Sequence, residues 1–563
     1  MAKRSESYSE RRKNAMYAKA EPWQNRIAAF VFIMLMCVQP LFLTPQRYIG
    51  LTKQKFVFFV VCMAFAALLA IIVWLYRLTR TPSLLPQEPM ALADWAVLGF
   101  ALVTLISALF SPYRKETNVW IGIPEPEGRY DGALTQMLYV VAYFIISRWY
   151  KPKTRDTALF GICAVVVALL GILQFYGMDF LKLWPNDMRE YHVENFYEIF
   201  FRSTLGNTNI VSTYVCVAIL LCGFMYVRVK SKWQPVWLAA SALNFWLMEL
   251  ADADSGRVGV AAALLLMIPF IIQNRRTIGR TLILAGSWLV VYALQKLLYD
   301  VNILGARTIS SLGLYLVAAA AALAAGIALT VIRGGGRGSR SGRAGRAGAA
   351  WTGSEAADDS AAQDPAVIRR KALAGVLLVV AIIAAGFSAV EILGKREAEK
   401  ESPGGIIYEI REVLHGSIAD ELGTNRVYIW RNALKALPKN PIIGSGPDTF
   451  LNAFPQEAQR YYGQEYDKAH NEYIQILICQ GIIGLFCYLV FIVAVAVKAI
   501  PAALRDPLAM AALAAFAGYC VQAFFNISVP IGSQMLWVIA GLLLCRSRDG
   551  TASRILGAPL TAR

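Results

Sequence analysis

The chain has 563 residues, of which 57% are apolar and 17% charged, and its formal net charge is +17. This composition excludes an ordinary soluble domain and is typical of a polytopic membrane protein. In such a protein the excess Lys and Arg belong to cytoplasmic loops, so the basic charge requires no nucleic-acid partner. All nine cysteines lie in apolar runs, which favours free, buried thiols over disulfides or metal clusters.

Uncharged apolar segments recur along the chain, and fourteen of them are candidate membrane spans. The candidates are residues 27–43, 56–75, 91–110, 133–146, 158–175, 210–227, 237–250, 258–272, 282–299, 312–332, 372–390, 473–497, 502–525 and 529–544. We therefore expect an all-α polytopic membrane protein with about 12–14 transmembrane helices and one large external loop before the last three spans.

Composition shifts divide the chain into five expected regions. These are a cytoplasmic N-terminal tail (1–26), a membrane domain with the first ten spans (27–332), a disordered Arg/Gly-rich cytoplasmic linker (333–370), a region with a span, an external loop at 391–470 and the last three spans (371–545), and a cytoplasmic tail (546–563). With the N-terminus inside, the short inner loops hold more Lys and Arg than the outer ones, which favours cytoplasmic termini in a bacterial plasma membrane.

The most informative stretch precedes the span that starts at Tyr473. Residues 424–441 have Val427, Trp430, Leu434 and Leu437 at helical spacing, which predicts an amphipathic helix. Two glycines follow at 444 and 446, where the backbone can turn tightly or approach a ligand. His470 and Asn471 then come directly before the span.

Other external loops place arginines beside helix ends. Arg257 follows a short turn at the start of a span, where free N–H groups and the helix dipole also favour an anion. Arg129 and Asp131 precede the fourth span, and Arg202 lies in the next external loop. A single Arg in such a place is commonly a lipid-facing anchor, but the combination of Arg257, Arg426 and His470 on the external side favours a functional site.

Asp252 and Asp254 have the spacing of a metal-binding pair, although two acids in a short turn are commonly just solvated. No stretch has the spacing of a metalloprotease helix or a nucleophile elbow. We therefore expect no metal and no other cofactor.

The region from Arg426 to Gly484 resembles the signature region of the O-antigen ligase and O-antigen polymerase superfamily. The matching residues are Arg426 and Trp430, then NPIIGSG at 440–446, then AHNEYIQ at 469–475, and GIIG at 481–484. Residues 254–257 (DSGR) resemble the upstream arginine motif of that family. The fourteen spans and the Arg-rich linker depart from the usual family layout of twelve spans.

The resemblance implies a metal-independent, inverting glycosyltransferase that moves a glycan en bloc from undecaprenyl diphosphate to an acceptor on the external face. His470 would be the catalytic base, because a neutral imidazole beside a helix N-terminus can accept the acceptor's proton. Arg257 and Arg426, with Arg129 and Arg202 as further candidates, would bind the diphosphate. Asn471, Trp430 and Asp131 would support the site.

Several alternatives share these residues. The acceptor may be a glycan, a lipid or a protein, so a polymerase or a protein O-glycosyltransferase would use the same chemistry. A transporter of the lipid-linked glycan is a different class, in which the arginines only bind. Few charges lie inside the expected spans, which favours an enzyme acting at the membrane surface over a transporter.

Overall fold

The computed structural model describes residues 22–80, 89–124, 128–183, 201–251, 254–303, 312–331, 365–399, 406–461 and 466–555. Nearly all regular structure in these ranges is helical. The two strands among them, β1 (Phe201–Arg202) and β2 (Gly206–Asn207), form one short antiparallel hairpin. The expected all-α fold is confirmed.

The first helix covers Pro22–Leu41 and contains a π-helical turn, η1 (Met34–Val38), before its last turn, α2 (Gln39–Leu41). The helices that follow, up to the expected linker, are α3 (Leu51–Arg80), α4 (Leu92–Leu109), α5 (Ala133–Trp149), α6 (Thr154–Phe175), α8 (Thr208–Arg228), α9 (Gln234–Ala251), α10 (Asp254–Ile271), α11 (Arg275–Ile303) and α12 (Leu312–Val331).

The second part of the chain begins with a long helix whose first residue is a proline, a residue suited to that position because it lacks an N–H. Its elements are α14 (Pro365–Ala398), α15 (Ile406–Leu414), α16 (Leu422–Ala436), η4 (Leu437–Lys439), α17 (Phe450–Ala453), α18 (Gln456–Tyr461), α19 (Glu472–Ala503), α20 (Pro507–Gln522), η5 (Ala523–Phe525) and α21 (Gln534–Ile555). Residues 333–364 of the expected linker lie outside the described residues, whereas residues 365–370 belong to α14.

Each of the fourteen expected spans coincides with a described helix. Eleven of these helices are long and apolar enough to cross a membrane, and the other three, α5, α9 and α21, are shorter or more polar. The protein is therefore a multi-pass membrane protein. The described residues contain eleven to fourteen helices that are candidates for membrane spans.

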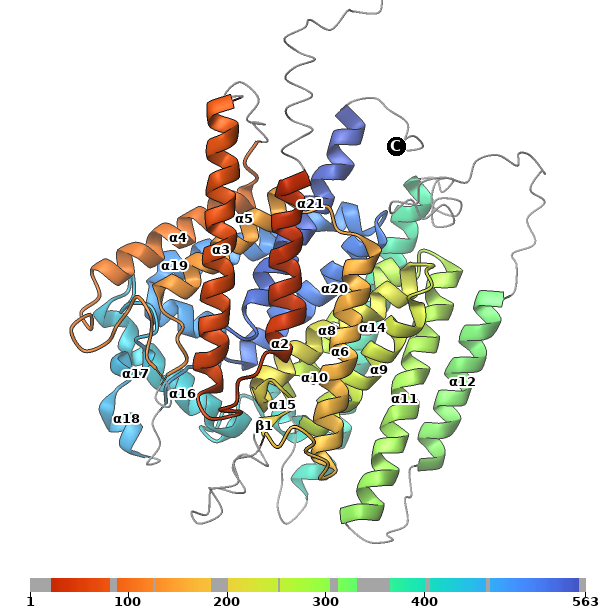
Figure 1. Cartoon of the computed structure of the whole chain (residues 1–563). Helices are drawn as coiled ribbons and strands as arrows, with labels where there is room; N and C mark the ends of the chain where they lie inside the picture. The colour runs from red at the N-terminus through yellow and green to blue at the C-terminus, as the bar shows by residue number, and fades with distance from the viewer. Residues whose placement is uncertain are drawn as a thin grey trace, which may run out of the picture.

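Burial separates central helices from peripheral ones. The apolar window of α8 is 94% buried, whereas that of α14 is only 6% buried. Accordingly α8 lies in the middle of the bundle and α12 at its edge (Figure 1). The exposed apolar side chains of α14 have the composition expected of a surface that faces lipid chains rather than water.

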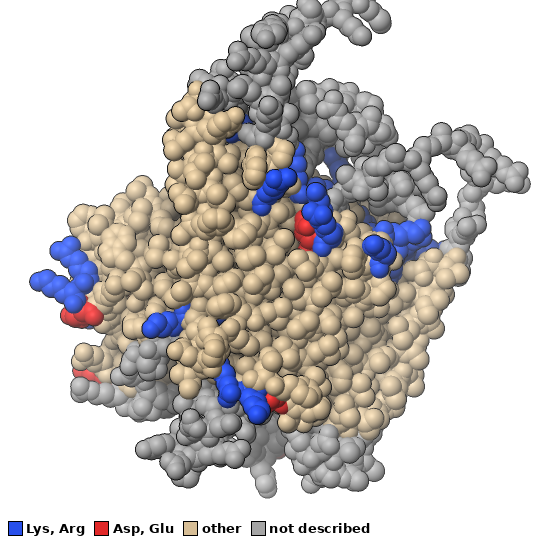
Figure 2. All heavy atoms as spheres, viewed as in Figure 1, with Lys and Arg blue, Asp and Glu red and all other residues tan. Residues whose placement is uncertain are grey.

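The small helices α15 to α18 gather at one end of the bundle, and the C-terminal end of α21 lies at the opposite end (Figure 1). Figure 2 shows a broad belt almost free of charge, with a group of Lys and Arg at the end where α21 ends and fewer at the opposite margin. This distribution is the one that the positive-inside rule associates with a cytoplasmic side.

The orientation of the bundle predicts which positions a membrane-impermeant thiol reagent reaches. Glu457 of α18 and Arg505 after α19 are both exposed and lie beyond opposite ends of α19. We expect Glu457→Cys to react in intact cells and Arg505→Cys to react only after permeabilisation. The parent protein, whose nine cysteines are free and buried or half-buried, is the control. The reverse pattern would place α15 to α18 in the cytoplasm.

Candidate functional site

The helix α16 starts after a tight backbone turn. Gly423, Thr424 and Asn425 have φ angles of 63°, 59° and 65°, so regular helical geometry begins only at Arg426. The buried side chains of this helix are Leu422, Tyr428, Ile429, Asn432, Ala433 and Ala436. Of the expected apolar stripe, Trp430 and Leu437 pack against buried side chains of this region, whereas Leu434 is 45% exposed.

Trp430 fixes the backbone just before His470. Its indole Nε1 donates to the carbonyl oxygen of Ala469 at 2.9 Å, and its ring packs against Phe524 and Phe525. On the other side, the N–H of Ala469 donates to the side-chain oxygen of Gln475 at 2.9 Å. The peptide that leads into His470 is therefore held from both sides.

The Gly-rich loop docks onto a break in α19. Gly481 interrupts that helix with a φ of 72°, which leaves backbone groups without helical partners. The N–H of Ser445 donates to the carbonyl of Ile478 at 2.9 Å, and the N–H of Ile482 donates to the carbonyl of Pro441 at 2.8 Å. The loop thus supplies the hydrogen bonds that the broken helix lacks.

Gly444 serves this contact. Its φ is +75°, and a Cβ there would lie 2.4 Å from the carbonyl carbon of Cys479. The sequence suggested that this glycine lets the backbone turn or approach a ligand, whereas the backbone that approaches it is that of α19. The two halves of the signature region are therefore one packed unit.

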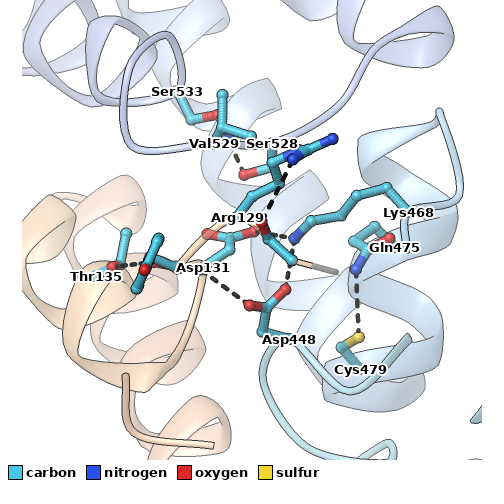
Figure 3. Close-up of polar contacts among 12 residues, drawn as sticks. Arg129, Asp131, Thr135, Asp448, Lys468, Gln475, Cys479, Ser528, Val529 and Ser533 are labelled. Carbon is cyan, nitrogen blue, oxygen red and sulfur yellow. Dashed lines mark hydrogen bonds and ion pairs between the residues drawn. The ribbon is translucent and has the colours of Figure 1, made fainter. Parts of the chain in front are cut away.

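A buried lysine joins three segments at the base of the site (Figure 3). The ammonium of Lys468 lies 2.7 Å from a carboxylate oxygen of Asp448 and 3.3 Å from one of Asp131. The second carboxylate oxygen of Asp448 accepts from the backbone N–H groups of Ile123 and Asp131, at 2.8 and 3.1 Å. We call Lys468, Asp131 and Asp448 the buried triad.

The triad stays charged. Burial alone would lower the pKa of Lys468, but the carboxylates of Asp448 and Asp131 outweigh burial and raise that pKa above its usual range. Burial raises the pKa of Asp131 to about 6, against the opposing effect of Lys468 and with a further contribution from Asp448. Near neutral pH the lysine is thus a cation held between two carboxylates.

The enclosed cavity beside the triad has a volume of about 10 Å³, lined in part by Asp131, Glu472 and Gln480. It has room for about one water molecule and none for a sugar. Glu472 accepts hydrogen bonds from Tyr488 at 2.6 Å and Tyr519 at 3.0 Å, which fixes the first turn of α19. This cavity is therefore too small to be a substrate site.

His470 lies two residues after the buried lysine and has a φ of 48°. It is half-buried, and no described residue hydrogen-bonds to its ring. Burial and the positive charges of Arg426 and Arg129 lower the pKa of His470 to about 4. The ring is therefore neutral near pH 7 and has a nitrogen available to accept a proton.

Asn471 has a different contact from the one expected. Its side-chain oxygen caps α19 by accepting from the N–H groups of Tyr473 and Ile474, at 3.0 and 3.1 Å. This oxygen is thus committed to the helix, whereas the buried side-chain nitrogen of Asn471 has no hydrogen-bond partner among the described residues. The free N-terminal dipole of α19 points toward the His470 segment.

Two cationic side chains face His470. Arg129 lies 3.4 Å from the carboxylate of Asp467, a residue three positions before His470. The half-buried guanidinium of Arg426 has no hydrogen bond or ion pair within 4 Å among the described residues. Burial lowers the pKa of Arg426, and the more distant charges of Asp254 and Glu409 oppose that effect.

Arg257 lies in the first turn of α10, and all three of its side-chain nitrogens have partners. Nη1 lies 2.7 Å from the carboxylate of Asp254, Nε lies 3.4 Å from that of Glu249, and Nη2 donates to the Glu249 carbonyl at 3.2 Å. The charge of Asp254 also acts on Arg426 and raises its pKa against the effect of burial. The fold thus brings Arg257, Arg426, Arg129 and His470 into one region.

Arg202 is the exception among the expected site residues. Its guanidinium lies over the ring of Phe175 at 5.4 Å from the ring centre, within the small hairpin. Its charge also acts on Tyr48, and the cation lies on the side of the hairpin rather than in the segment that leads to His470. Within the described parts of the chain, no group of three or more His, Cys, Asp or Glu side chains is arranged to hold a metal, and Asp252 lies outside those parts.

Sequence reasoning missed Lys468, Asp448 and Glu249. A charged residue directly before a membrane span is commonly a surface anchor, and the sequence gives no distance between Lys468 and the acids it meets. One signal was available, because Lys468 is only two positions from the expected base. The pairing itself depends on segments more than 300 residues apart.

Residues 309–489 match the family model described as O-antigen ligase. This part of the chain is similar to the O-antigen ligase family. The chain is also similar to the exopolysaccharide production protein ExoQ of Rhizobium meliloti (strain 1021), with 27% identity over 154 residues. That match covers 25% of this chain and 35% of the relative.

These comparisons agree with the resemblance read from the sequence: both similarities are to membrane polysaccharide proteins of that superfamily. The matched region includes Arg426 and His470, whereas Arg257 and Arg129 precede it. Arg129 and Arg257 lie outside the matched region in sequence, and the fold brings them close to it.

The buried triad predicts a large cost for removing its cation. Lys468→Met leaves two carboxylates facing each other in a buried site, and we expect a loss of about 3–5 kcal/mol in unfolding free energy. Chemical denaturation of the parent and the variant in mild detergent measures this loss in unfolding free energy. Arg431→Met is the control, because Arg431 pairs with Asp420 while 52% exposed, and we expect a loss of at most about 1 kcal/mol. Equal effects would show that the triad does not stabilise the fold.

Proposed function

We propose that the protein transfers a glycan en bloc from undecaprenyl diphosphate to a hydroxyl acceptor at the external membrane surface. His470 is the general base, and Arg426, Arg257 and Arg129 bind the diphosphate. The reaction is inverting and needs no divalent metal. The partners are the lipid-linked glycan, its acceptor and the surrounding lipid.

One observation carries this proposal. A half-buried guanidinium, Arg426, lies close to a neutral imidazole without any bonded partner in the described chain. A buried cation with unused donors is costly unless an anion binds to it during function. Because a diphosphate offers several oxygens and arginine presents a planar fork of donors, this pair matches the donor's head group.

The residues support a balanced single displacement. A lone pair of the acceptor oxygen attacks the anomeric carbon of the donor sugar while the acceptor proton moves to His470. The bond from that carbon to the phosphate oxygen breaks, and its electron pair stays on the departing undecaprenyl diphosphate. The arginines stabilise the charge that develops there. One direct displacement inverts the anomeric configuration.

Three classes of acceptor are compatible with this chemistry: a glycan, a lipid and a protein. The similarity to a protein named for exopolysaccharide production favours a glycan acceptor, and hence polymerisation, as the second candidate. A protein O-glycosyltransferase would use the same groups. Purified protein supplied with a lipid-linked glycan and each acceptor separately distinguishes the three by the product formed.

A transporter would need ionisable groups along a path through the membrane. The buried charges Lys55 of α3, Asp94 of α4 and Glu472 of α19 instead lie near the starts of their helices. Each is bound by fixed groups, such as the carbonyls of Gln39 and Pro40 around Lys55. Their placement supports an enzyme rather than a transporter.

Replacing the arginines should affect donor binding. We expect Arg426→Ala and Arg257→Ala each to weaken donor binding and to lower kcat/KM by about 10²-fold, the scale of one charge-assisted hydrogen-bonded contact. Lysine at either position should restore only part of the activity, because it lacks the guanidinium fork. Arg202→Ala is the matched control and should retain activity. Full activity of both Lys variants would reduce the role of the arginines to long-range charge.

Replacing the base should affect turnover rather than binding. For His470→Ala we expect nearly unchanged donor affinity and a kcat lowered by about 10²–10⁴-fold. Because the pKa of His470 is about 4, the ring is neutral above that value, so kcat/KM should fall only as the pH drops through about 4 rather than through 6.5. Parent-like turnover in the Ala variant would assign His470 a structural role.

Metal independence has its own test within the same assay. Activity should survive EDTA and remain unchanged on adding Mn²⁺ or Mg²⁺. Loss of activity with EDTA and its recovery with either ion would assign part of the chemistry to a metal.

A further inference from the structure

The partners of Arg257 are not equivalent. Glu249 holds Nε and Nη2 and is only 14% exposed, whereas Asp254 holds Nη1 and is 52% exposed. A ligand that reaches Arg257 from outside therefore meets Asp254 first. Glu249 can keep the guanidinium oriented while the contact to Asp254 is exchanged.

Asp254 also has a second cation nearby. Its charge acts on Arg426, which belongs to α16, more than 160 positions away in the chain. Asp254 is the first residue of α10, where the free N–H groups of the helix end favour a negative charge. One exposed carboxylate thus lies where two guanidiniums and a helix N-terminus all favour an anion.

We propose that Asp254 is a displaceable internal anion, which occupies the Nη1 position of Arg257 in the empty enzyme and gives it up to the donor diphosphate. This inference rests on the proposed function. It makes Asp254 a positioning residue that lowers the affinity for diphosphate and so speeds release of the product, undecaprenyl diphosphate.

The physical reason is competition. A diphosphate held by two fixed arginines and a helix end would leave slowly, because most differences in affinity appear in the dissociation rate. A tethered carboxylate that takes back its contact as the product leaves offsets part of that affinity. The earlier alternative of a metal-binding aspartate pair requires the same carboxylate, which the arginine already occupies.

The test is binding of inorganic diphosphate to the detergent-solubilised full chain by isothermal titration calorimetry. Asp254→Asn keeps the side-chain size and removes the charge, so we expect it to bind diphosphate on the order of fivefold more tightly than the parent. Product inhibition by undecaprenyl diphosphate should strengthen by a similar factor. Asp254→Glu, which keeps the charge, should resemble the parent.

Asp506→Asn is the matched control. Asp506 is also an aspartate at a helix start, it pairs with Arg546, and it lies beyond the opposite end of α19. Its replacement should leave the diphosphate affinity unchanged, and an equal gain there would overturn the proposal.

The outcomes separate this inference from the proposed function. If the parent binds diphosphate in a manner lost in Arg257→Ala, while Asp254→Asn binds equally or more weakly, Asp254 only orients the arginine and the inference is wrong. If the parent shows no such binding that depends on Arg257, the diphosphate site itself is wrong.

Discussion

The ion pair between Lys468 and its two aspartates is the constraint on which the site depends. Lys468 draws together the loop before α5, the loop after the Gly-rich turn and the segment that ends at His470. Loss of one partner would leave an unpaired charge in a buried site, so separating these segments has a large free-energy cost. Arg129 and His470 are neighbours because both flank members of this triad in sequence.

The break in α19 plays the complementary part. A continuous helix would have no unsatisfied groups at Gly481, and the Gly-rich loop would have no place to dock. Because the loop is docked, α16 packs against α19 and Trp430 reaches the backbone of Ala469. The imidazole is therefore set by contacts on the membrane helix, rather than by the conformational preferences of a long loop.

Much of the fold was readable from the sequence, because apolar runs of membrane length are a strong and local signal. The fourteen expected segments became fourteen helices, and Arg257 was correctly placed in a first helical turn. The site was less readable. Asn471 was expected beside the ring but caps α19, since Asn is as suited to one role as to the other.

The remaining misses have a common cause, which is that local sequence does not contain distances between segments. Neither the triad nor the exchange of partners around Arg257 follows from spacing, because each joins residues from different helices or loops. The buried face of α16 is a further example. Apolar periodicity predicted a stripe that includes Leu434, whereas the structure buries Asn432, Ala433 and Ala436 and leaves Leu434 45% exposed.

The length of α19 after its break has a consequence for where the chemistry takes place. From residue 482 to Ala503 the helix is about 33 Å long, close to the ~30 Å thickness of the hydrocarbon layer. The part before Gly481 then extends into the head-group layer, and His470 lies at its tip. The number of residues in the second half of this helix therefore determines how far the imidazole lies from the lipid tails.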